Sequence, residues 1–240
     1  MGNRGGARYG SLDVGVPGAS ARARADELAR RAAQRRRAQF GALAPVLAVF
    51  MGPDRVAEAW RRGADGEVMV GRRLTDAVDG LGVVLHDRRL GHGRANIDHL
   101  VIVPSGVWVV DAKRYRGRLR RWDGRGSLFV DRPTVGGHDL RGLAASVQHQ
   151  SAVVSEQLPD DVAVQAALCF AGVERSLLSR PFIVDGTHVT WPRALARELR
   201  QRGPLGPKRR EELASHLARA FPPYAPSGTS HKPTGAPPRG

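Results

Sequence analysis

Short apolar runs separated by glycine, proline and aspartate dominate the middle of the chain. Runs of this kind, rich in Val, Ile and Leu, are typical of buried strands. They predict strands over residues 83–86, 97–103, 107–111, 118–122, 128–130, 162–170, 182–184 and 187–190. Turn-forming residues at 104–106 and 185–186 predict that two neighbouring pairs of these strands form hairpins.

Helical patterns precede, interrupt and follow the strands. Residues 21–39 are rich in Ala and Arg, and we interpret them as a basic helical arm with charge on all sides. The pattern over residues 56–79 predicts a helix that is broken or kinked near Gly63 and Gly66. Further helices are predicted over residues 139–158, 192–202 and 207–221. This order predicts an α/β domain in which helices flank a central mixed sheet.

Composition divides the chain into four predicted parts. Residues 1–54 are expected to form a basic N-terminal arm, disordered over about the first twenty residues and helical beyond them. Residues 55–190 form the predicted α/β domain, and residues 191–222 a helical extension. Residues 223–240 are rich in Pro, Gly and Ser and are expected to be a disordered tail.

The net charge of +15 predicts a polyanionic partner, either nucleic acid or an anionic membrane surface. Most of the excess lies outside the α/β region, because residues 55–192 carry 19 basic and 16 acidic side chains. The longest apolar run, residues 40–51, is interrupted by Pro45 and is shorter than the roughly 20 residues of a membrane span. We therefore expect no stable membrane insertion. The single cysteine, Cys169, and the lack of a secretory signal pattern predict a cytoplasmic location.

One of only three lysines in the chain, Lys113, follows an apolar strand in which Asp111 shares its face. A lysine acts as a compact point charge that arginine replaces poorly. Asp98 interrupts the apolar face of the neighbouring strand, and the hairpin sets it at a depth similar to that of Asp111. An ordinary surface ion pair and an aspartate bonded to a turn amide are alternative explanations that remain open.

Two helical side chains also fall on apolar stripes. Glu67 is expected to begin the second half of the broken helix and continues its core-facing stripe, and Gln150 does so in the helix over residues 139–158. Three carboxylates and a lysine suit metal-assisted phosphodiester hydrolysis, with Mg²⁺ or Mn²⁺ bound by oxygen ligands. A helix-terminal acid and a partly exposed glutamine are the structural alternatives.

A row of arginines follows this set directly: Arg114, Arg116, Arg118, Arg120 and Arg121. In an extended chain three of them share a face that would follow a nucleic-acid backbone. An edge strand protected by charge against aggregation explains them equally well.

Several stretches resemble the nuclease-related domain (NERD) family of the restriction-endonuclease-like PD-(D/E)xK group. They are Gly66-Glu67, Leu85-His86-Asp87-Arg88-Arg89, Ala95-Asn96-Ile97-Asp98-His99-Leu100 and residues 104–117. The resemblance covers about residues 60–175 and implies a restriction-endonuclease-like fold. It implies Glu67, Asp98, Asp111 and Lys113 as the active-site set, with the three carboxylates as metal ligands. Gln150 matches a glutamine in the family's following helix.

These observations predict a Mg²⁺-dependent nuclease that hydrolyses DNA phosphodiester bonds, with RNA as an open alternative substrate. A homodimer or a helicase partner is compatible with this prediction. Two other functions remain open. One is a non-catalytic nucleic-acid-binding module on the same fold, and the other is association with a membrane surface through residues 21–51.

Overall fold

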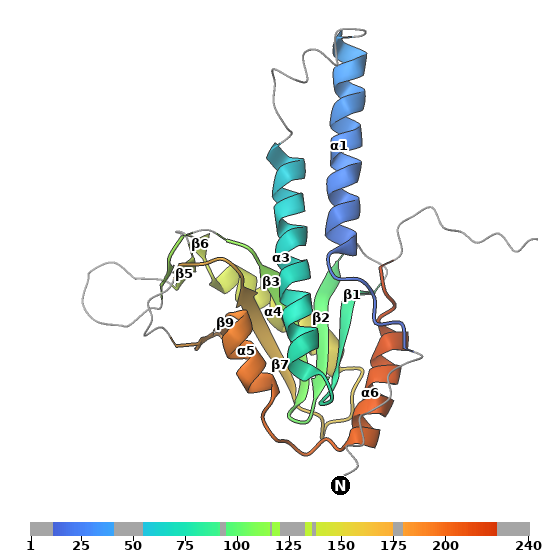
Figure 1. Ribbon diagram of the computed structural model, residues 1–240, viewed down its shortest axis with the longest axis vertical. Helices are drawn as coiled ribbons and strands as arrows, with labels where there is room; N and C mark the ends of the chain where they lie inside the picture. The colour runs from blue at the N-terminus through green and yellow to red at the C-terminus, as the bar shows by residue number, and fades with distance from the viewer. Residues whose placement is uncertain are drawn as a thin grey trace, which may run out of the picture.

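The computed structural model of the 240-residue chain describes residues 12–40, 55–91, 95–115, 117–120, 133–135, 138–174 and 180–224. Its centre is a six-stranded sheet in the order β1-β2-β3-β7-β9-β8 (Figure 1). The strands are β1 (Val83–Arg89), β2 (Asn96–Val103), β3 (Gly106–Lys113), β7 (Val164–Phe170), β8 (Phe182–Val184) and β9 (Thr187–Thr190). Pairing is parallel between β3 and β7 and between β7 and β9, and antiparallel elsewhere, so the sheet is mixed.

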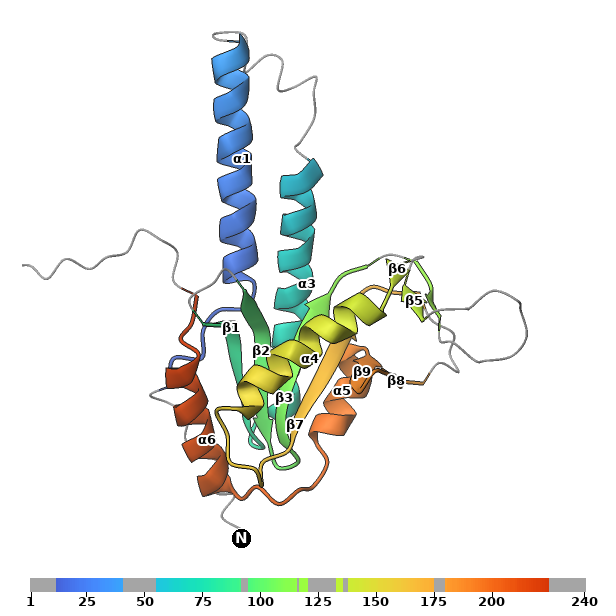
Figure 2. The ribbon, with the colours of Figure 1, turned by 180° about the vertical axis from the view of Figure 1, so that it is seen from behind.

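Helices cover both faces of this sheet. On one face α3 (Arg55–Val78) and α5 (Pro192–Leu199) pack through residues such as Leu74 and Leu195. On the other face lie α4 (Arg141–Ser155) and α6 (Pro207–Ala220), which bury Val147 and Leu217 (Figure 2). The predicted α/β architecture is therefore confirmed, and it is consistent with a restriction-endonuclease-like fold.

One helix and a second, small sheet lie outside these layers. The helix α1 (Ala19–Phe40) runs beside α3 and matches the predicted basic helix. A small second sheet contains β4 (Leu119–Arg120), β5 (Thr134–Val135) and β6 (His138–Asp139). The strand predicted over residues 118–122 is thus only partly observed, and the one over residues 128–130 lies outside the described residues. In the described part of the chain, the structure contains no helix that is both long and apolar enough for a membrane span.

The prediction of a break in the helix near Gly63 and Gly66 is wrong. The helix α3 continues through both positions, so Glu67 lies inside it and does not begin it. At Gly66 an added Cβ would lie 2.7 Å from the Cβ of Arg114, which directly follows β3. The glycine therefore permits close packing between α3 and the chain leaving β3, and a single glycine inside a helix is tolerated at a cost of about 1 kcal/mol.

The expectation that the first twenty residues are disordered is wrong for residues 12–20. The N–H of His86 donates to the carbonyl of Val14 (2.7 Å), and an added Cβ at Gly15 would collide with the His86 carbonyl at 2.2 Å. Residues 12–20 are therefore held against β1 by a backbone hydrogen bond and by the close approach of a glycine to the strand. Composition alone does not reveal such partners.

Arg88 in β1 joins three distant parts of the chain although its accessible surface is zero. Its guanidinium donates to the carbonyls of Asp13 (2.8 Å), Ala218 (2.8 Å) and Phe221 (2.6 Å). Two of these carbonyls belong to the last turn and C-cap of α6, where helical partners are lacking. The buried charge thus satisfies acceptors that would otherwise be unpaired.

We predict that Arg88→Ala lowers the free energy of unfolding by about 3 kcal/mol or more, because a charged hydrogen bond contributes roughly 1.5–3 kcal/mol and its loss leaves buried acceptors unpaired. Arg89→Ala is the matched control, since this neighbouring side chain is exposed and its guanidinium lies 5.9 Å from the ring centre of Tyr224. Urea unfolding of both variants measures the difference. Equal destabilisation by the two substitutions would contradict this role for Arg88.

Candidate active site

The hairpin of β2 and β3 brings two predicted carboxylates together. In this pairing His99 lies opposite Val110. Continuing the antiparallel register by one residue sets Asp98 opposite Asp111, at the end of the sheet away from the hairpin turn. The two aspartates therefore stand at the same depth, as the spacing from the turn predicted.

Lys113 is two residues beyond Asp111 and lies on the same face of β3. Its Nζ lies 2.8 Å from both carboxylate oxygens of Asp111. Burial favours a lower pKa for Lys113, but the charges of Asp111 and Asp98 outweigh burial and raise the pKa above its ordinary value. The lysine is thus held in its charged form between two acids.

Asp98 and Glu67 approach this pair from different elements. Asp98 Oδ2 accepts a hydrogen bond from the N–H of Ala112 (2.9 Å), and Glu67 Oε1 accepts one from the N–H of Gly18 (2.8 Å). Burial, then the charges of Asp111 and Glu67, raise the pKa of Asp98 well above its usual range. The structure therefore brings together the four predicted residues of the core set, and each influences the ionisation of at least one other.

Glu67 is a second buried acid of this set whose pKa is raised. Only 5% of the residue is exposed, and burial is the main reason that its pKa rises from 4.5 to about 7. The negative charges of Asp87 and Asp111 raise the pKa further, against the hydrogen bond from Gly18 and the charge of Lys113. The site has more negative charge than a single lysine neutralises, which favours a bound cation or bound protons.

The carboxylates do not form a closed metal-ligand set in this arrangement. Among the described residues, no three His, Cys, Asp or Glu side chains lie together closely enough to hold a metal ion. Each acid is instead engaged by a protein partner: Glu67 by a backbone amide, Asp98 by another, and Asp111 by Lys113. By donor chemistry the set still fits Mg²⁺ or Mn²⁺, because carboxylate oxygens are the ligands that hard divalent cations prefer. Excess negative charge in a buried position supports the same fit.

Asp87 is a residue of this region to which sequence reasoning assigned no role. It is 1% exposed and adopts a left-handed backbone conformation with φ of 48°. Its carboxylate accepts hydrogen bonds from the N–H of Ser20 (2.5 Å) and from Asn96 Nδ2 (2.8 Å). Asp87 thus anchors the start of α1 beside Glu67. No periodicity marks this residue, because one partner is a backbone amide 67 positions away and the other a side chain on the next strand.

Gln150 and the arginine row are less closely linked to the acids. Gln150 lies in α4, on the side of the sheet that carries Asp111, and its buried Oε1 lacks a hydrogen-bond partner within the described structure. Within the described residues, no hydrogen bond joins Gln150 to the three acids or to Lys113. Arg114 is 3.7 Å from exposed Asp65, and Arg118 is exposed. Arg116, Arg121 and the side chain of Arg120 lie outside the described part of the structure.

Two buried histidines lie behind the site, between β1, β2 and α3. Their Nδ1 atoms are 3.0 Å apart, and Thr75 Oγ1 lies 3.2 Å from Nε2 of His86. Burial lowers the pKa of both rings, to about 4 for His86, so both are neutral at pH 7. An added Cβ at Gly71 would lie 3.1 Å from the ring of His99. The pair therefore fills the space beneath α3 as packed, uncharged rings.

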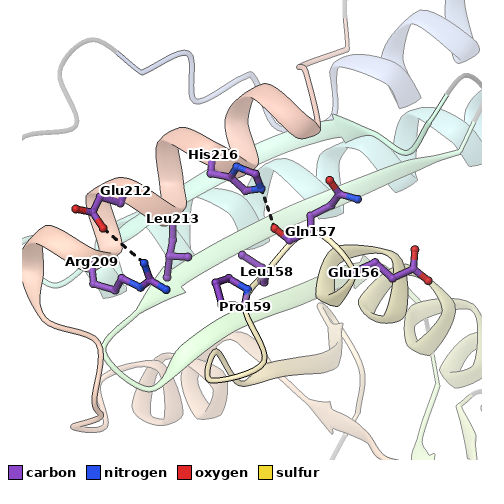
Figure 3. Close-up of a pocket in the computed structure, with 8 residues that line it drawn as sticks. All are labelled: Glu156, Gln157, Leu158, Pro159, Arg209, Glu212, Leu213 and His216. Atoms are coloured by element: carbon purple, nitrogen blue, oxygen red, sulfur yellow. Dashed lines mark hydrogen bonds and ion pairs between the residues drawn. The ribbon is translucent and has the colours of Figure 1, made fainter.

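A hollow of about 440 Å³ lies elsewhere, between the C-terminal end of α4 and α6 (Figure 3). Its apolar lining includes Leu158 and Leu213, and polar groups on its rim pair with one another. Arg209 lies 3.7 Å from Glu212, and His216 Nε2 lies 2.7 Å from the carbonyl oxygen of Gln157. The hollow shares no residue with the carboxylate site. We therefore assign the candidate chemistry to the carboxylates and not to this hollow.

Comparison with protein families provides the classification. Residues 62–171 match the family model of the nuclease-related domain. This segment is a NERD domain. Comparisons with curated proteins and with solved structures gave no match.

The NERD segment contains all five residues expected to form the active site, from Glu67 in α3 to Gln150 in α4. It spans somewhat less than half of the chain and ends directly after β7. Residues 12–40, which contact Glu67 and Asp87, lie outside it, as do α5 and α6. The family therefore indicates a nuclease-related function, while the N-terminal contacts are additions beyond the matched segment.

We predict that the stability of the protein falls between about pH 4.5 and pH 7. Because the pKa of Glu67 is raised to about 7, the folded protein retains a proton that the unfolded chain releases. Glu67→Gln should remove the part of this loss that comes from Glu67 and raise the free energy of unfolding at pH 8 by up to about 3 kcal/mol, with little change below pH 4.5. The raised pKa of Asp98 contributes a loss of the same sign, which the substitution leaves in place. Urea unfolding at both pH values tests the prediction.

Asp76→Asn is the control, since it replaces an exposed acid on the same helix. A Glu67→Gln variant that shows the wild-type loss of stability between the two pH values would refute the assigned ionisation of Glu67.

Proposed function

We propose that this NERD domain is a divalent-metal-dependent nuclease that hydrolyses DNA phosphodiester bonds. The observation that supports the proposal is the accumulation of buried acids near Lys113. Asp111 lies 2.8 Å from the lysine, and the charge of Lys113 lowers the pKa of both Asp98 and Glu67 against the effect of burial. Excess carboxylate charge around one charged lysine suits a site that binds a cation and a phosphodiester together. The positive charge of the whole chain supports a polyanionic substrate.

The side chains have distinct roles in this proposal. Glu67, Asp98 and Asp111 would hold the metal ion, which stabilises developing negative charge on the phosphate and lowers the pKa of a bound water. Lys113 places a permanent positive charge beside Asp111, where it orients the attacking water or neutralises a phosphate oxygen. Its raised pKa keeps that charge throughout the neutral range.

A second candidate function is non-catalytic binding of nucleic acid on the same scaffold. The observation that favours it is the lack, among the residues described, of three acids or other ligands already grouped around a metal position. In that case Lys113 and Asp111 form a structural ion pair. Binding would then depend on salt but not on Lys113, and no metal-dependent product would form.

We predict that the purified protein cleaves plasmid or single-stranded DNA in Mg²⁺ or Mn²⁺ and that Lys113→Met reduces the rate at least about 100-fold, as loss of a group that stabilises transition-state charge does. Asp111→Asn should have an effect of similar size. Gel analysis of product against time measures both rates.

Lys208→Met is the matched control. It removes the same positive charge, but from an exposed position on α6. It should cleave within about twofold of wild type, as a surface substitution away from the site. Equal cleavage by wild type and both site variants would indicate a contaminating nuclease and would contradict the nuclease assignment.

We further predict that Mn²⁺ stabilises the folded protein through the same acids. A ligand at 100 times its Kd adds about 2.7 kcal/mol to the free energy of unfolding. For a chain of this size that corresponds to a rise in Tm of several degrees. Asp111→Asn should lose most of the rise, whereas Asp76→Asn should keep it. Calorimetric scans with and without Mn²⁺ decide this independently of cleavage, and an equal rise in both variants speaks against a metal at these acids.

A further inference from the structure

The helix α1 begins at the candidate active site and extends away from it. It has 22 residues, which corresponds to a length of about 33 Å. Figures 1 and 2 show that α1 and the N-terminal part of α3 project side by side beyond the edge of the sheet. A ligand bound at the carboxylates thus has α1 as its neighbour on this side of the molecule.

The start of α1 is fixed by site residues. The N–H of Gly18 donates to Glu67 and the N–H of Ser20 donates to Asp87, so two acids cap amides that lack helical partners. Asn96 Nδ2 also donates to Ser20 Oγ at 3.0 Å. These bonds orient the helix relative to the site, and α1 is a fixed extension of that site at its base.

The apolar side of α1 is already used within the protein. Ala21 and Ala25 are buried, with 8% and 0% exposure, against α3. A membrane-surface helix needs an apolar face that is free to enter the lipid. The described part of α1 lacks such a face, so its remaining surface offers chiefly charge.

That surface carries more arginine than acidic side chains can neutralise. The sequence of α1 contains seven arginines and only two acids, Asp26 and Glu27. Glu27 pairs with Arg24 (2.9 Å) and with Arg31. With Arg35 these two arginines follow the spacing i, i+7, i+11, which places all three on one side of the helix. Within the described residues, exposed Arg35 forms no ion pair.

We propose that the arginine-bearing side of α1 binds the phosphate backbone of duplex DNA that leaves the candidate active site. The proposal rests on the proposed function, because it takes the ligand of this surface to be the substrate of that site. Charge complementarity supports it, and the length of α1 is close to one turn of B-DNA, about 34 Å. The surface lies outside the NERD segment, so it would add affinity for long substrates and leave the chemistry unchanged.

The test uses the double variant Arg31→Gln/Arg35→Gln of α1. The control is the double variant Arg72→Gln/Arg73→Gln, which removes the same charge from two exposed positions of α3. Fluorescence anisotropy in EDTA measures binding to duplexes of about 30 and about 8 base pairs at several salt concentrations. The α1 variant should bind the long duplex about tenfold more weakly, with a salt slope lower by about 2, since each lost phosphate contact removes about 0.9. Binding of the short duplex should be unchanged.

Arg31→Lys/Arg35→Lys keeps the charge and should restore binding to within about threefold of wild type, because phosphate accepts lysine as a point charge. Circular dichroism checks that each variant retains its helix. The proposal is overturned if the α1 variant binds the long duplex as the α3 control does. It is also overturned if the substitutions weaken only binding to anionic phosphatidylserine vesicles, which would assign the surface to a membrane.

Failure of the nuclease proposal has a different signature. If wild type cleaves no DNA in Mg²⁺ or Mn²⁺ but the α1 variant still loses affinity for the long duplex, the binding surface stands and the catalytic assignment falls. If wild type cleaves DNA and the α1 variant binds and cleaves the long duplex as well as the control does, the catalytic assignment stands and the binding surface falls.

Discussion

The crowding of buried negative charge around Lys113 is the interaction on which the rest of this site depends. Asp111 lies in direct contact with the lysine, and Asp98 and Glu67 are close enough to change the ionisation of their neighbours. A packed domain built only for stability would avoid placing three acids beside one base. The arrangement is understandable when the site has to accept a further positive charge together with an anionic substrate.

The fold holds these side chains together by two local features, the turn between β2 and β3 and a glycine in α3. The turn between β2 and β3 determines the register, and register alone sets Asp98 opposite Asp111. Gly66 then lets α3 approach Arg114 closely enough to bring Glu67 to the strand ends. A larger side chain at position 66 would push apart the two elements that the site combines, without touching any of its acids.

Periodicity and turn chemistry predicted the six strands of the main sheet, the hairpin of β2 and β3 and the shared depth of the two aspartates, because these depend on residues near one another in the sequence. The short strands β5 and β6 were not predicted. They also placed Glu67 on the inner side of its helix, although the helix was expected to be broken before it. The docking of residues 12–20, the role of Asp87 and the buried position of Arg88 were not predictable in this way. Their partners are backbone amides and carbonyls far along the chain, and a backbone group is the same at every residue. Whether the five candidate residues act in catalysis remains a prediction.

The outer edge of β1 is covered by segments from both sides of the domain. On the N-terminal side, the carbonyl of Val14 accepts a hydrogen bond from the N–H of His86. On the C-terminal side, the carbonyl of Pro222 accepts one from the N–H of Arg89, and the N–H of Tyr224 donates one to the carbonyl of Asp87. During synthesis β1 therefore emerges with an open edge that only closes once residues 222–224 have followed it. An unpaired edge strand is a template for association with other chains. The same contacts cover this edge in the completed protein, so association through β1 is a risk of the period before they form.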